Sequence, residues 1–131
     1  MSVRSEANRT TVVALLALLC TACDNGPVEV SDPFYLWHLE DPQATALFRC
    51  VDVREMVCAI DGLPDPPVLA AGANARFVVL GKSEGYLYFR RTPQERHGWG
   101  NNPEVMIGPL SQKQFNAAQR ELGLPDANIT P

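Results

Sequence analysis

The sequence predicts an α+β domain in which an antiparallel meander of five to six short strands is followed by one C-terminal helix. The strands are indicated by short apolar and aromatic segments that alternate with turn-forming Gly, Pro and Asp residues. The helix is indicated by a single amphipathic segment near the C-terminus. No segment repeats with a period of about 20 to 50 residues, which argues against a repeat architecture.

The first strand is expected at residues 34–39 (FYLWHL), an apolar and aromatic segment that Asp41-Pro42 ends. Residues 44–51 fit either a short helix or a second strand, and we favour a strand that ends near Cys50. A turn at residues 52–54 then leads into a short strand at residues 56–60. The prolines that follow cannot join a ladder and end that strand. Residues 68–74 are small and irregular in pattern and are expected to form a loop.

The clearest hairpin pairs residues 76–80 (RFVVL) with residues 86–90 (YLYFR) around a loop bracketed by Gly81 and Gly85. Leu87 and Phe89 lie on one face of the second strand and are expected to point into the core. Tyr86, Tyr88 and Arg90 lie on the other face. Residues 92–103 are polar and predict a loop, and residues 104–108 (EVMIG) predict one more strand.

The helix is expected at residues 112–122. Ser111 and Gln114 form a capping-box pattern at its start, and Gly123 followed by Pro125 ends it. Phe115, Ala118 and Leu122 share one stripe that would pack on the sheet.

The N-terminus has the order of a secretory signal, with Arg4 and Arg9 before the apolar residues 12–23 (VVALLALLCTAC). That segment is too short for the roughly 20 residues that span a bilayer. It resembles a bacterial lipobox in which Cys23 is lipidated, although Cys20 occupies the position where Leu is usual. Plain secretion and a retained anchor are the alternatives to this lipoprotein interpretation.

The lipoprotein interpretation divides the chain into four parts. Residues 1–22 would be the signal peptide, 23–33 a lipidated N-terminus and tether, 34–125 one globular domain, and 126–131 a frayed tail. The domain would then lie on the periplasmic side of a cell membrane. Asp24 resembles a signal for retention at the inner membrane, but the choice between inner and outer membrane stays open.

The cysteines fall into two pairs. Cys20 and Cys23 match a C-x-x-C motif, which we reject because one would leave with the signal and the other would carry lipid. Cys50 and Cys58 are expected to form a disulfide across a hairpin in an oxidising periplasm. A redox-active pair and two free thiols are the alternatives.

Charge and motifs argue against several classes of function. The chain has a net charge of −4, and removal of residues 1–22 makes it one unit more negative, which disfavours nucleic-acid binding. His38 and His97 have no metal-ligand spacing, and Gly81-Lys82-Ser83 lacks the first glycine of a P-loop. No serine lies in a G-x-S-x-G elbow. We therefore expect no cofactor, no metal and no enzymatic activity.

The strongest candidate for a binding surface is a cationic and aromatic segment in this acidic chain, because Arg and Trp are enriched at interface hot spots. A solvated edge with a tryptophan covering the core is the alternative. The candidate partner-binding residues are Arg90, Arg91, Arg96, His97 and Trp99.

The C-terminal segment resembles the ending of several small bacterial lipoproteins of uncharacterised families. The resemblance rests on residues 107–110 (IGPL) followed by Phe115, Arg120, Leu122 and Leu124-Pro125. In size, anchor and single disulfide the chain is also similar in type to periplasmic immunity lipoproteins, which block a toxic secreted enzyme. We expect a lipid-anchored immunity or inhibitor protein, with a structural or assembly lipoprotein of an envelope complex as the alternative.

Overall fold

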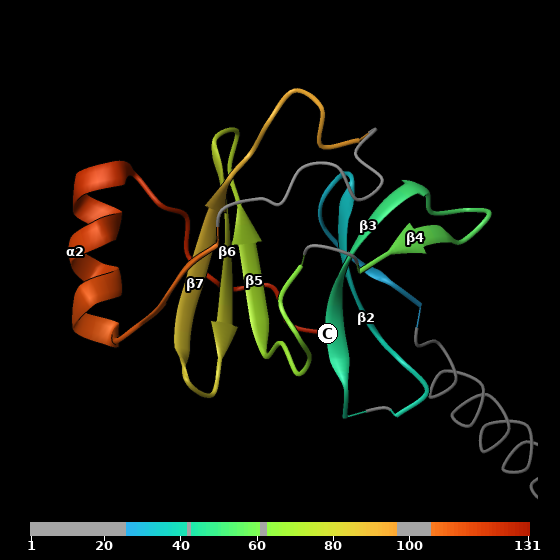
Figure 1. Cartoon of the computed structure of the whole chain (residues 1–131), viewed down its shortest axis with the longest axis horizontal. Coiled ribbons are helices and arrows are strands. Elements are labelled where there is room, and N and C mark those ends of the chain that lie inside the picture. The colour runs from blue at the N-terminus through green and yellow to red at the C-terminus, as the bar shows by residue number, and fades with distance from the viewer. Residues whose placement is uncertain (1–25, 42, 61–62, 97–105) are drawn as a thin grey trace, which may run out of the picture.

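The computed structural model describes residues 26–41, 43–60, 63–96 and 106–131, which form eight strands and one helix. The strands make two antiparallel sheets of four, each a meander of consecutive strands. Figure 1 shows three layers, with the second sheet between the first sheet and the helix. The predicted α+β class is confirmed, but the single meander of five to six strands is replaced by two meanders.

The first sheet contains the residues on either side of the cysteine pair. Its strands are β1 (Val28–Ser31), β2 (Phe34–His38), β3 (Thr45–Asp52) and β4 (Val57–Ala59). The expected strands at residues 34–39, 44–51 and 56–60 are therefore present with small shifts at their ends. The helical alternative for residues 44–51 is wrong, because these residues pair with β2 over the whole length of that strand.

The second sheet contains the predicted hairpin and adjoins the helix. Its strands are β5 (Ala70–Ala73), β6 (Phe77–Lys82), β7 (Gly85–Arg90) and β8 (Ile107–Leu110), and the helix is α2 (Gln112–Leu122). The strand expected at residues 104–108 lies further along the chain, as β8. Both glycines of the expected hairpin loop belong to the ladder, which leaves a tighter turn at Ser83 and Glu84.

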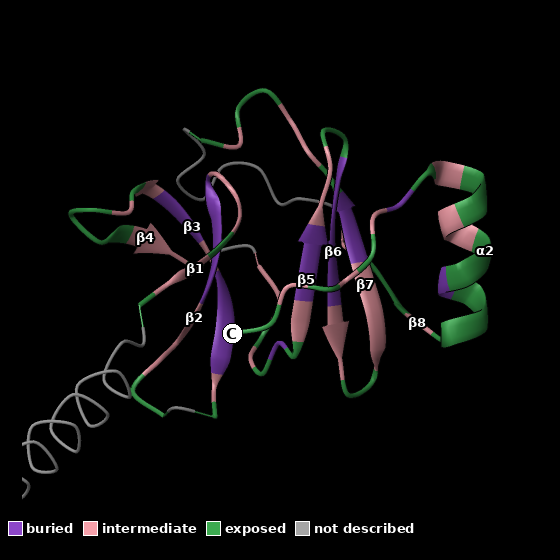
Figure 2. Cartoon of the chain, turned by 180° about the vertical axis from the view of Figure 1, so that it is seen from behind, coloured by how far each residue is buried: buried purple, intermediate pink, exposed green. Residues whose placement is uncertain are grey.

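The main core lies between the two sheets, where Figure 2 shows the buried segments facing one another. Phe34 and Phe89 meet edge to face with ring centroids 5.4 Å apart, one ring from each sheet. Such an aromatic pair contributes about 1 kcal/mol of stability beyond that from burying the two rings. The fully buried apolar members of this core are Phe34, Leu36, Leu47, Val68, Ala71, Val78, Leu80 and Phe89.

A second cluster lies on the other face of the second sheet, under α2. The ring of Phe115 stacks on Tyr86 at 4.2 Å, and Phe77, Val79 and Tyr88 pack around them. Tyr86 and Tyr88 therefore face the helix, so both faces of the hairpin are covered. This explains why residues 77–80 (FVVL) are apolar without alternation.

The helix has the predicted bounds and caps. The hydroxyl of Ser111 accepts from the backbone N–H of Gln114, and the side chain of Gln114 accepts from the backbone N–H of Ser111. Gly123 ends the helix in the left-handed region, with a φ of 72°. These contacts confirm the capping box and the glycine stop.

Three segments that were expected to be irregular take part in the fold. Residues 28–31 of the expected tether form β1, and residues 70–73 of the expected loop form β5. The expected frayed tail pairs with β5, because Ala71 and Ile129 each donate a backbone hydrogen bond of 2.8 Å to the other. The ladder with β6 and an isolated bridge to the tail therefore define β5, whose small residues have little strand propensity of their own.

The disulfide between Cys50 and Cys58 is confirmed. The two cysteines face each other directly across β3 and β4, and Cys50 is 2% exposed. The bond ties the short edge strand β4 to the rest of the first sheet.

We expect that replacing both cysteines by Ala lowers the free energy of unfolding by about 2–3 kcal/mol, because a loop of about nine residues is no longer closed in the unfolded chain. Urea denaturation measures the change. Thiol labelling of the unaltered mature protein under denaturing, non-reducing conditions should find no free thiol, and two reactive thiols would refute the staple.

The C-terminal tail allows a second prediction. A side chain at Gly72 would collide with the backbone carbonyl of Asp126, so Gly72→Ala should displace the tail from β5 and destabilise the protein by about 1–3 kcal/mol. Gly26→Ala is the matched control, since nothing lies within 4 Å of the added methyl group there. Proteolysis that cuts residues 126–131 no faster in Gly72→Ala than in Gly26→Ala would contradict the prediction.

Candidate functional site

The segment after β7 passes from the second sheet toward the first and carries two of the predicted binding residues, Arg91 and Arg96. It is the orange segment above the gap between the sheets in Figure 1. Residues 93–96 form a turn, and the side chains of Arg91 and Arg96 both reach the turn between β1 and β2. This segment therefore bridges two sheets that belong to separate hydrogen-bonded ladders.

Arg91 makes the inward contacts of this bridge. Its guanidinium donates to Ser31 Oγ at 2.6 Å, at the end of β1, and to the carbonyl of Asp32 at 2.9 Å, in the β1–β2 turn of the first sheet. It also donates to the carbonyl of Asn74 at 3.0 Å, next to β5 in the second sheet. One side chain thus holds both sheets with directional bonds.

The charge of Arg91 is paired within the same segment. Glu95 accepts from it at 2.7 Å, and the two side chains are only 13% and 14% exposed. The guanidinium also lies 5.8 Å from the ring centroid of Phe34. Arg91 is therefore a largely buried residue with internal partners, and it is not part of an exposed binding surface.

Arg96 makes the outward contact of the bridge. Its guanidinium forms an ion pair with the carboxylate of Asp32, and these side chains are 48% and 40% exposed. Asp32 also accepts a long hydrogen bond of 3.5 Å from the hydroxyl of Tyr35. Burial raises the pKa of Tyr35 above its usual value, and the negative charge of Glu29 raises it further. Arg96 remains accessible, but its charge is partly compensated.

Arg90 is exposed at the end of β7 and forms no ion pair within the part of the chain that the structure describes. Arg76, also exposed, is its neighbour, because Phe77 pairs with Arg90 and the carbonyl of Arg76 accepts from the N–H of Arg91 at 2.8 Å. We call Arg76, Arg90 and Arg96 the basic end. Arg76 was missed from the sequence, although the predicted hairpin of residues 76–80 and 86–90 places it opposite Arg90.

The other predicted candidates are placed differently. His97 and Trp99 lie outside the described residues, so the structure says nothing of their part in the surface. His38 is partly buried at the end of β2, with its ring 5.8 Å from that of Trp37, as expected for a packing residue.

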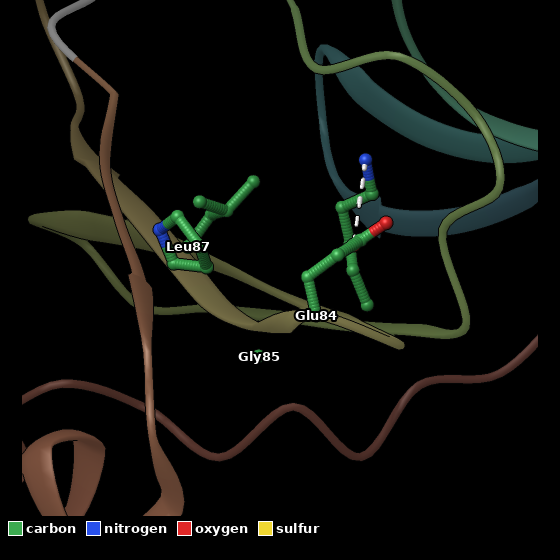
Figure 3. A pocket seen from close by; sticks show the side chains of 5 residues that line it. Glu84, Gly85 and Leu87 are labelled. Atoms are coloured by element: carbon green, nitrogen blue, oxygen red, sulfur yellow. Dashed lines mark ion pairs between the residues drawn. The ribbon is translucent and has the colours of Figure 1, made fainter.

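A separate depression of about 190 Å³ lies at the β6–β7 turn. Figure 3 shows Leu87 and Glu84 at its sides, with the ion pair between Lys82 and Glu84 at 4.0 Å. The ammonium of Lys82 also donates to the carbonyl of Asp65 at 2.7 Å. The depression therefore presents an engaged cation and apolar surface, without a convergent set of reactive groups.

Comparisons and searches give no family assignment. No protein-family model matches the sequence, and neither curated proteins nor solved structures gave a match. Among the described residues, no group of three or more His, Cys, Asp or Glu side chains is placed to hold a metal ion. No helix in those ranges is long and apolar enough to cross a bilayer.

We expect Arg91→Lys to lower the free energy of unfolding by about 3 kcal/mol, because Lys keeps the charge but cannot reproduce the fork that reaches both sheets. Arg90→Lys is the matched control and should leave stability unchanged, since Arg90 is exposed. Urea denaturation of both variants checks this. Equal midpoints for the two variants would show that Arg91 does not join the sheets.

Proposed function

We propose that this chain is a lipid-anchored protein of the cell envelope that acts by binding a protein partner, as an immunity or inhibitor factor against a toxic enzyme. One observation carries the proposal: the buried hydrogen-bond network of Arg91 lies beside three exposed arginines, one at the end of β7, one just before β6 and one in the turn at residues 93–96. Arg90 and Arg96 flank Arg91 along the chain, while Arg76 adjoins it across the ladder. The basic end is thus fixed in place before any partner arrives.

Such pre-ordering favours tight binding. A partner that binds a flexible loop must order it, at about 0.5–1.5 kcal/mol for each immobilised side chain, whereas a fixed turn avoids part of that loss. The backbone around the basic end is held by Asn74, whose side-chain oxygen accepts from the N–H groups of Arg76 and Phe77 at 2.9 and 2.8 Å. A patch of about 800 Å² on one partner is enough for a stable interface.

The charges indicate the kind of surface that would bind there. The chain is acidic overall, yet the basic end has three exposed arginines, and one of them, Arg96, pairs with the partly exposed carboxylate of Asp32. Local charge decides which surfaces fit together, and net charge acts mainly on solubility and encounter rate. An acidic rim around an enzyme's active site is therefore the partner surface that we propose.

The anchor completes the proposal. Lipidation at Cys23 would confine the domain to a thin layer at the membrane, which raises its effective concentration against targets near that membrane. An inhibitor of modest affinity then remains effective where a secreted enzyme would attack.

The binding proposal is tested by capture from envelope extracts with the intact, anchored protein as bait. We expect a toxic enzyme as stoichiometric prey, and an affinity at least about tenfold lower for Arg76→Glu/Arg90→Glu, because two contacts become repulsive. Lys113→Glu is the matched control, an exposed charge reversal on α2. Prey made up of envelope-assembly proteins would instead support the assembly alternative.

The anchor is tested by metabolic labelling. Cells that produce the unaltered protein and receive radiolabelled palmitate should yield labelled protein in the membrane fraction. Cys23→Ser should abolish the label, because the sulfur that carries the lipid is gone. Unlabelled, unprocessed protein in the soluble fraction of cells with the unaltered sequence would refute the anchor.

A further inference from the structure

The β3–β4 hairpin exposes apolar side chains that the contacts described so far do not use. Met56, Val57 and Ile60 are 41%, 39% and 37% exposed. They are three of the five large apolar residues that the described part of the chain exposes, and they fall within five consecutive positions. An exposed apolar group of this kind marks a contact with another surface more often than a scattered single residue does.

Hydrogen bonds hold the turn of the hairpin, which ends at Met56, directly before β4. The carboxylate of Asp52 accepts from the backbone N–H groups of Arg54 and Glu55 at 3.0 and 3.1 Å. Met56 has a φ of 56°, which L-residues seldom adopt, and its N–H donates to the carbonyl of Val53 at 3.3 Å. Directly behind the turn, the disulfide closes the hairpin. Strained, exposed backbone of this type concentrates at functional contacts.

The hairpin lies at the end of the molecule where the chain enters the fold. Figures 1 and 2 place both the start of β1 and the β3–β4 turn at the end opposite α2. Because β1 begins at Val28, four residues separate it from Cys23, and the five Cα–Cα steps between them span at most about 18 Å when extended. An acylated Cys23 would therefore hold this end of the molecule close to the bilayer.

We propose that Met56, Val57 and Ile60 lie in the interface of the lipid bilayer that holds the acylated N-terminus. This proposal rests on the lipid anchor of the proposed function. The occupant of the exposed apolar group is thus a lipid surface and not a second protein. The charges agree, since Arg54 and Glu55 offset each other and the carboxylate of Asp52 is engaged with the backbone.

Contact at two points would fix how the domain sits on the membrane. Acyl chains alone leave a domain free to rotate about its tether, and amphipathic side chains at the interface remove that freedom. The helix α2 would then point away from the bilayer, and the basic end would remain open to a partner.

The test uses the full, processed protein reconstituted into phosphatidylethanolamine–phosphatidylglycerol vesicles whose acyl chains carry bromine. An environment-sensitive fluorescent amino acid replaces Met56, Ile60 or, as the reference on α2, Asn116. We expect the probes at positions 56 and 60 to lose most of their fluorescence relative to unbrominated vesicles, and the probe at 116 to lose none. The probe at position 60 gives an independent result if a probe at position 56 disturbs the turn.

Hydrogen exchange provides a second test that needs no fluorescent probe. Binding to vesicles should slow hydrogen exchange at residues 53–60, and Met56→Ser/Val57→Ser/Ile60→Ser should abolish that protection. Leu69→Ser/Ile107→Ser removes exposed apolar groups elsewhere and should retain it, because these residues are 53% and 42% exposed outside the hairpin.

The outcomes separate the two proposals. Protein that fails to associate with vesicles at all would overturn the anchor and this orientation with it. Anchored protein whose probes at 56 and 60 stay as accessible as the probe at 116 would overturn the orientation alone. In that case, weaker capture of a protein partner by the triple-serine variant would assign the hairpin to protein binding.

Discussion

The relative position of the two sheets depends on Arg91. Each sheet is a complete ladder, and the core between them consists of apolar side chains whose attraction has no direction. The guanidinium of Arg91 adds direction, because its fork reaches Ser31 and Asp32 on one side and Asn74 on the other. A buried ion pair contributes little net stability once desolvation is included, so we interpret its role as fixing one arrangement of the sheets. The apolar core provides the stability, and Arg91 determines how the sheets are placed.

The same network continues to the helix and to the surface. Asn74 accepts from Arg91 through its backbone carbonyl, and its side-chain amide donates to the carbonyl of Gly123 at 2.9 Å, where α2 ends. On the other side, Asp32 accepts from Arg91 through its carbonyl and pairs with Arg96 through its carboxylate. Helix, second sheet, first sheet and basic end are thus joined through consecutive polar contacts. A disturbance at the basic end would therefore reach the interior, which is why stability must be measured beside binding for any variant there.

The sequence predicted the elements whose signals are local, and it failed where partners distant in the chain decide the outcome. Ser111, Gln114 and Gly123 specify the ends of the helix by contacts within a few residues, and these ends were predicted correctly. Residues 70–73 (AAGA) have no strand pattern, and only β6 and the tail at Ile129 make them a strand. The division into two sheets was missed because each sheet is a meander of consecutive strands. The order of strands and turns along the sequence is then the same for one meander as for two. Arg91 lies in a polar, charged segment and has the sequence context of a surface residue, although Ser31, Asp32 and Asn74 surround it.

The arginines of the candidate surface also could not be told apart from the sequence. Arg90, Arg91 and Arg96 are close in sequence, yet their side chains have different surroundings: Arg90 is exposed, Arg91 is enclosed, and Arg96 is half exposed beside Asp32. Strand alternation explains the first two, because successive residues at the end of β7 point to opposite faces. Arg91 points between the sheets with Phe89, and Arg90 points to the other face of the sheet with Tyr88, opposite Phe77 in the ladder. A cationic segment that crosses the edge of a two-sheet core therefore serves two purposes at once. Its inward members hold the fold together, which keeps its outward members in place for a partner.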